Sequence, residues 1–140
     1  MKHNKWFVAL MLLFIPIIAA AQLPQGQQVA TKVPFAFMVG KVAVPAGEVT
    51  VQLANETGSI LLVRNRDAKV GLYTLTAGTR SEKPAPVPAM IFHKYGETYF
   101  LAGLRIADSR SVYAFNESKL EKELRAENVP QAEVQVASAK

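Results

Sequence analysis

The feature that most constrains the fold is an alternation of apolar and polar residues with a period of two. In residues 29–39 the odd-numbered positions are mostly apolar, and in residues 49–53 Val49, Val51 and Leu53 alternate with polar side chains. This period is typical of strands that bury one face. Pro34 has no N–H to donate to a neighbouring strand, so its segment is expected at a sheet edge or a bulge.

Turn residues divide the chain into short segments. Gly40-Lys41 and Gly96-Glu97 suit tight hairpin turns, and the prolines of residues 79–88 suggest a crossover between sheets. The sequence predicts an all-β fold, either a small antiparallel sandwich or a partly closed barrel of about seven short strands. Further strands are expected at residues 42–44, 49–53, 60–63, 70–76, 89–95, 98–106 and 111–115.

A short C-terminal helix is expected after Ser118. Ser118 and Glu121 have the spacing of a capping box, in which the serine accepts from the third helical residue and the glutamate reaches back. Glu121 and Arg125 could form an ion pair one turn apart, and Leu120 and Leu124 share a face.

The first residues have the three parts of a secretory signal peptide. Lys2 and Lys5 precede an apolar run at residues 6–21, and Ala19 and Ala21 occupy the −3 and −1 positions before Gln22. The alternative is a retained anchor, but the run is shorter than the ~20 residues that a spanning helix needs. We expect cleavage after Ala21 and no stable membrane span afterwards.

Four parts of the chain follow from these patterns. Residues 1–21 form the signal peptide, 22–28 a flexible leader, 29–127 the β domain with its helix, and 128–140 a disordered tail. The expected location is extracytoplasmic, either periplasmic or secreted. The absence of cysteine excludes disulfides, thiolate nucleophiles and cysteine-based metal sites.

The positive charge is modest and scattered. The formal charge is +5, and removal of Lys2 and Lys5 leaves 14 basic against 11 acidic residues, or +3. Nucleic-acid binders concentrate basic residues on one face, so the sequence does not favour that class.

Few side chains could carry catalysis. His93 is the single histidine after the signal peptide, and Asp67 and Asp108 are the only aspartates, both in turns. A serine–histidine–aspartate relay, a metal cluster and a glycine-rich phosphate loop are all missing from the pattern. We predict a protein that is not an enzyme and has no cofactor or metal. Most acids are expected on solvated turns or on the helix, namely Glu48, Glu56, Glu82, Glu97 and those of residues 117–127.

One hairpin gathers aromatic and charged side chains. His93, Tyr95, Tyr99 and Arg105 are the candidate ligand face, because a concave sheet with such residues could hold a polar or glycan-like ligand. The alternative is that the aromatic residues only stabilise the hairpin by cross-strand pairing, with His93 packed in its strand.

Several phrases resemble a family of small secreted proteins from environmental Gram-negative bacteria. They include VPFAFMVG at residues 33–40, PAGE at 45–48, ILLVR at 60–64, FHKYG at 92–96 and YFL at 99–101. The resemblance implies export and a β fold, and no activity or functional residue comes with it. Val49 stands where that pattern has an aromatic residue.

The leading interpretation is a non-catalytic interaction or structural module of the cell envelope or exterior. One alternative is a small-ligand carrier, unless Phe35, Phe37, Ile60, Leu62, Phe92 and Phe100 fill the core. Another is self-assembly through residues 33–39 at a sheet edge. An envelope polymer, an envelope protein and a second copy of the chain remain open as partners.

Overall fold

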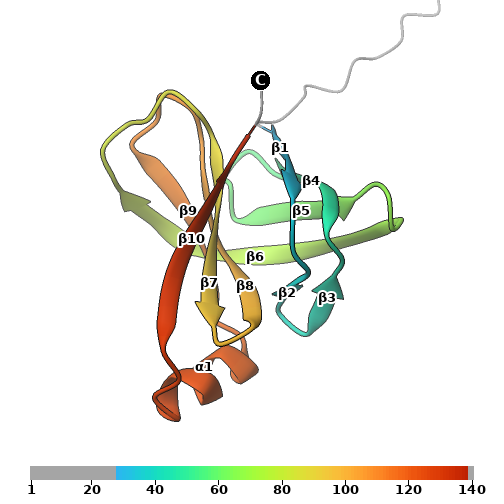
Figure 1. The fold of residues 1–140 in the computed structure, drawn as a ribbon. Coiled ribbons are helices and arrows are strands. Elements are labelled where there is room, and N and C mark those ends of the chain that lie inside the picture. The colour runs from blue at the N-terminus through green and yellow to red at the C-terminus, as the bar shows by residue number, and fades with distance from the viewer. Residues whose placement is uncertain (1–27, 139–140) are drawn as a thin grey trace, which may run out of the picture.

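The computed structural model describes residues 28–138, which form a mostly β fold with one short helix (Figure 1). The predicted all-β class and the C-terminal helix are confirmed. The elements are β1 (Gln28–Val33), β2 (Phe37–Val39), β3 (Val42–Val44), β4 (Gly47–Leu53), β5 (Ile60–Asn65), β6 (Val70–Ser81), β7 (Ala89–Tyr95), β8 (Thr98–Arg105), β9 (Ser111–Phe115), α1 (Lys119–Ala126) and β10 (Gln131–Ala137).

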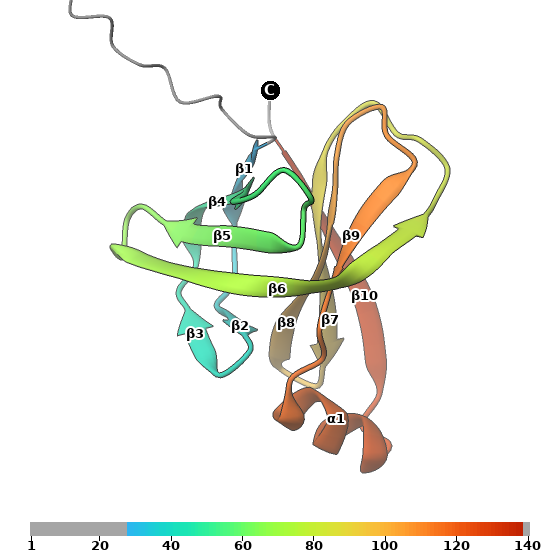
Figure 2. The same cartoon turned by 180° about the vertical axis from the view of Figure 1, so that it is seen from behind.

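The strands form two layers joined by β6. In the first layer β1, β4, β5 and β6 are consecutive antiparallel neighbours. The second half of β6 then pairs with β9, and the second layer continues through β8 to β7 and β10, with β2 and β3 beside β8. Figures 1 and 2 show β5 and β6 crossing β7 and β8. The sheet is not closed into a barrel, so the structure fits the sandwich alternative.

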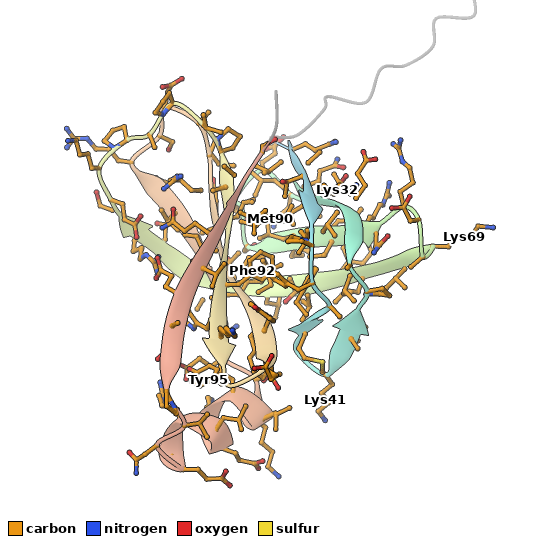
Figure 3. All side chains as sticks on the ribbon, in the orientation of Figure 1. Lys32, Lys41, Lys69, Met90, Phe92 and Tyr95 are labelled. Carbon is orange, nitrogen blue, oxygen red and sulfur yellow. The ribbon has the colours of Figure 1, made fainter. Side chains whose placement is uncertain are left out.

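The core lies between these layers. The alternation of residues 29–39 is seen in burial: Val29, Val33, Phe37 and Val39 are buried. Met90 and Phe92 of β7 lie at the centre of the molecule (Figure 3) and are fully buried. Burial of such side chains is the main source of stability in a domain without disulfides. Other members of the core are Val44, Val49, Val51, Leu61, Val63, Leu101, Leu104 and Phe115.

Pro34 divides the first expected strand. β1 ends at Val33 and β2 begins at Phe37, with a bend between them. β1 is an edge of its layer, as the proline suggested, but β2 lies between β3 and β8. The expectation that residues 33–39 form one free edge is therefore wrong, because the chain changes layers at the bend.

β6 continues beyond its expected end. The sequence predicts a strand at residues 70–76, yet β6 runs to Ser81 with an irregularity between Thr76 and Gly78. A bulge bends a strand without ending it. The bend lets one strand belong to both layers. The expected crossover between sheets at residues 79–88 is therefore wrong, because the chain changes layers within β6, and the segment after Ser81 connects two strands of the second layer.

The predicted disordered tail is wrong for most of its length. β10 pairs antiparallel with β7 over seven residues, from Gln131 opposite Tyr95 to Ala137 opposite Ala89. Val134 and Val136 pack against the core. Together with the division at Pro34, this strand raises the number of strands above the expected seven.

The expected signal peptide and its cleavage residues Ala19, Ala21 and Gln22 lie outside the described residues, as does nearly all of the expected leader. Within residues 28–138, no helix has the length and hydropathy that a membrane crossing requires.

Candidate functional site

His93 and Tyr95 of β7 meet a buried acid from α1. Glu121 Oε1 lies 2.8 Å from His93 Nδ1, and the Tyr95 hydroxyl donates to the same oxygen over 3.3 Å. Glu121 is only 3% exposed. The prediction of a solvated helix acid is therefore wrong for this residue.

The Ser118 cap places Glu121 in the first turn of α1. The Ser118 hydroxyl accepts from the Glu121 N–H over 3.1 Å, which confirms half of the capping box. The Glu121 carboxylate does not reach back to complete the box. The expected ion pair with Arg125 is also wrong, because Arg125 Nη1 lies 2.6 Å from Glu117 Oε1 instead.

The electrostatics of this cluster favour a neutral Tyr95 that donates a hydrogen bond to Glu121. Burial raises the pKa of Tyr95, and the Glu121 carboxylate raises this pKa further because it repels a phenolate. A neutral tyrosine can donate to the carboxylate, whereas a phenolate cannot. The cluster thus fastens α1 to the β7–β8 hairpin.

The four candidate ligand residues do not converge. His93 pairs with Phe100 and Lys94 with Tyr99, so Tyr99 lies on the opposite face from His93. Tyr99 stacks on Phe35 with ring centroids 3.8 Å apart, and Lys94 Nζ lies 5.4 Å from the Tyr99 centroid.

Arg105 lies at the other end of β8. It pairs with Ala89, and Arg105 Nη1 donates to Gln135 Oε1 of β10 over 3.0 Å. Its contacts therefore join β8 to a strand that the sequence analysis did not predict. The structure places two candidate residues beneath α1, one against Phe35 and one beside β10.

A basic hollow lies on the outer face of the first layer. Its volume is about 450 Å³, and it contains three cationic side chains and no carboxylate. The residues that line the basic hollow are Gln28, Thr50, Gln52, Arg64, Asn65, Arg66, Lys69, Val70 and Gly71.

The register of the sheet forms the hollow. Arg64 stands directly opposite Gly71, which has no side chain to fill the space beside it. A Cβ built on Gly71 would lie 3.7 Å from Arg64 Cγ. The acid of the adjoining turn faces elsewhere, because Asp67 Oδ2 accepts from the Glu48 N–H over 3.1 Å.

A second depression, the β6 groove, runs beside the first half of β6. Its volume is about 600 Å³ and its lining is mainly apolar. Tyr73 is 69% exposed and Leu75 is 61% exposed, which is unusual for such large side chains. The residues that line the β6 groove are Val39, Gly40, Ala54, Ile60, Tyr73, Thr74, Leu75, Leu101, Phe115, Asn116, Glu117 and Ser118.

One edge of the first half of β6 has no partner strand along this groove. The Thr76 N–H donates to the Ser59 carbonyl over 3.0 Å, so even-numbered residues of this half point their backbone groups toward β5. The N–H and C=O groups of Gly71, Tyr73 and Leu75 therefore point to the opposite edge. Pairing with β9 begins only at Thr76, and no other strand of the described chain covers that edge (Figure 2).

Sequence reasoning missed both depressions, although signals for each were present. Residues 70–79 contain no charged residue and no proline, the devices that usually protect an edge. Arg64, Arg66 and Lys69 are close in sequence, but the neighbours that complete the hollow come from β1 and β4. Those partners follow from sheet register and not from local sequence.

Comparisons of the chain with protein-family models, with curated proteins and with solved structures find no match. Among residues 28–138 no three histidine or acidic residues are grouped as a metal site would need. The geometry of the described surface is therefore the basis for any functional proposal.

Proposed function

We propose that this chain is an exported, non-catalytic interaction module that binds an extended peptide segment of a partner protein in the β6 groove. The signal-peptide pattern supports export to the periplasm or the exterior. The observation that carries the proposal is the unpaired, uncharged edge of β6 beside an apolar groove.

A peptide strand would satisfy this edge. The unpaired N–H and C=O groups of Gly71, Tyr73 and Leu75 match the backbone of an added antiparallel or parallel strand. Alternate side chains of that strand would point toward Leu101 and Phe115. Main-chain hydrogen bonds would give affinity, and the apolar groove would favour apolar residues at every second position.

The shape of the groove favours a single segment over a second folded copy of the chain. Val39 and Gly40, at the β2–β3 turn, stand on one side of the edge. Asn116 and Ser118, which precede and cap α1, stand on another. A second copy would bring the same obstructions beside its own β6, whereas an extended peptide brings none.

The packing favours an interaction module over a carrier with an internal cavity. Phe37, Phe92 and Phe100 are buried, and Phe37 and Phe92 meet edge to face with centroids 5.0 Å apart. The basic hollow and the β6 groove both open to solvent. The space between the layers is used for packing.

Amide hydrogen exchange gives a residue-level test. Short peptides selected from a random displayed library against the mature protein serve as probes. On binding, the amides of Gly71, Tyr73 and Leu75 should become protected, whereas those of Val70, Leu72 and Thr74 should change little because they already bond β5. Selected peptides should have apolar residues at alternate positions.

A proline variant supplies the matched comparison. Leu75→Pro removes an N–H that has no partner in β5, so we expect the fold to be retained and peptide affinity to fall at least about tenfold. Val42→Lys changes another exposed apolar residue, outside the groove, and should leave affinity unchanged. Equal binding by the wild type and Leu75→Pro, or protection of all six amides alike, would contradict the proposal.

A further inference from the structure

We infer that the basic hollow binds the anionic groups of an acidic saccharide. This site lies outside the β6 groove, since no residue lines both depressions. The two sites adjoin at β6, where Gly71 lines the hollow and Tyr73 lines the groove, so the variants that test this inference leave both residues unchanged. The inference rests on three unpaired cations, on the polar side chains beside them and on the geometry of an open sheet face.

The cations of the hollow have no carboxylate partner in the part of the chain that the structure describes. Other basic residues of the described chain do pair: Arg80 with Glu82 at 2.7 Å and Arg125 with Glu117 at 2.6 Å. Within residues 28–138, Arg64, Arg66 and Lys69 form no ion pair. They are exposed side chains around one concave surface, so their potentials add where a ligand would lie.

The turn between β5 and β6 holds this arrangement in place. Asn65 is 1% exposed, and its amide Nδ2 donates to the Pro45 carbonyl over 2.8 Å. Its Oδ1 accepts from the Ala68 N–H over 3.0 Å. The backbone between Arg64 and Lys69 is thereby fixed, and Lys69 at the hairpin tip projects away from the rest of the molecule (Figure 3).

The remaining lining suits sugar hydroxyls better than a bare anion. The amides of Gln28 and Gln52 and the hydroxyl of Thr50 can each donate and accept, as a saccharide requires. A free phosphate would use donors only. Arginine guanidinium groups meanwhile match the planar fork of a carboxylate and also bind sulfate.

The same sheet face offers an apolar platform beside the hollow. The pair Leu62–Tyr73 lies next to the pair Arg64–Gly71 along β5 and β6, with the same orientation. Because Tyr73 is 69% exposed, its ring can contact the apolar face of a sugar ring. The site therefore fits an oligosaccharide whose acidic groups enter the hollow and whose next ring rests on Tyr73.

Binding of defined saccharides to the mature protein tests the inference. Oligogalacturonate supplies carboxylates, sulfated dextran oligosaccharides supply sulfates, and unmodified dextran oligosaccharides are neutral. Calorimetric titration at low salt should detect at least one acidic probe and not the neutral one, and affinity should fall as salt is added. Sodium phosphate at the same ionic strength should not compete beyond its effect as a salt.

Two triple variants distinguish binding in the basic hollow from a general effect of the protein's net charge. Arg64→Gln, Arg66→Gln and Lys69→Gln together should weaken acidic saccharide binding at least about tenfold. Lys41→Gln, Lys83→Gln and Lys122→Gln remove the same charge from exposed positions outside the hollow and should change it less than about twofold.

Three outcomes would overturn the inference. They are no binding of either acidic probe, equal binding of the neutral dextran, and equal loss in the two triple variants. Tyr73 is kept out of the variants because it also lines the β6 groove. Peptide binding by the hollow variant should remain intact, so failure of this inference and failure of the proposed function are distinguishable.

Discussion

Among individual residues, Glu121 makes the contacts with the greatest energetic consequence. A carboxylate so little exposed is stabilised only through its hydrogen bonds to His93 and Tyr95. The aromatic rings continue this cluster: Tyr95 packs edge to face on Phe100 with centroids 5.8 Å apart. A single acid thus couples the helix to the hairpin.

Glu121→Ala should lower the free energy of unfolding by about 2 kcal/mol, because it leaves His93 Nδ1 and the Tyr95 hydroxyl without this acceptor. Urea unfolding of the mature protein measures the change. Glu123→Ala, on the same helix but solvent-exposed, is the control and should change stability by less than about 0.5 kcal/mol. Equal losses in the two variants would show that Glu121 acts only through helix propensity.

Tyr95 should make stability fall at alkaline pH. Its pKa in the folded state is raised above the usual 10.0, so the unfolded chain loses the phenolic proton first as pH rises. The stabilisation that Tyr95 contributes is complete below the usual pKa of 10.0. It is lost as the pH rises through the higher pKa of Tyr95 in the folded state. The gap in unfolding free energy between the wild type and Tyr95→Phe should therefore narrow above about pH 10, as measured by urea unfolding. Parallel profiles would exclude this linkage.

At the scale of elements, β6 and β10 show how a strand acquires its role from its neighbours. The first half of β6 pairs with β5 and the second half pairs with β9, so each half has one partner strand. Its exposed large apolar residues, Tyr73 and Leu75, lie in the first half, before pairing with β9 begins. β10 has polar residues toward solvent and gains order by pairing with β7.

Removal of residues 131–140 should destabilise the domain by roughly 3 kcal/mol. The deletion uncovers the edge of β7 and removes the partial burial of Val134 and Val136. Thermal unfolding measures the change, with a chain that ends at Ser138 as the control, since it keeps every pairing of β10. A truncated chain as stable as this control would contradict the role of β10.

For the whole molecule, two layers share one long strand and leave two depressions that adjoin along β6. The hollow uses the outer face of β4, β5 and β6, and the β6 groove uses the gap in pairing before β9 begins. The proposed peptide and saccharide sites would both use surfaces that open to solvent.

The predicted export and cleavage of the chain can be tested by measuring the mass of the recovered protein. We expect the protein recovered from the periplasm or medium to have the mass of a chain that begins at Gln22. Ala19→Arg places a large charged side chain at the −3 position and should leave the longer precursor in the cell. A recovered mass that includes residues 1–21 would disprove cleavage.

The sequence alone determined the β class, most strand positions and the cap at Ser118, because these follow from local periodicity and backbone preference. Val49 and Val51 are buried as their alternation predicts. It could not determine that residues 131–137 form a strand, since that order depends on the distant edge of β7.

Only the tertiary structure decided which residues face one another. It turned Glu121 of α1 toward His93, set Arg64 opposite Gly71, and left one edge of the first half of β6 without a partner strand among the described residues. Each of these features depends on sheet register and layer crossing, in which residues far apart in sequence compete for the same neighbours. Local patterns do not contain that information, because the pairing energy depends on contacts that form only when the layers close.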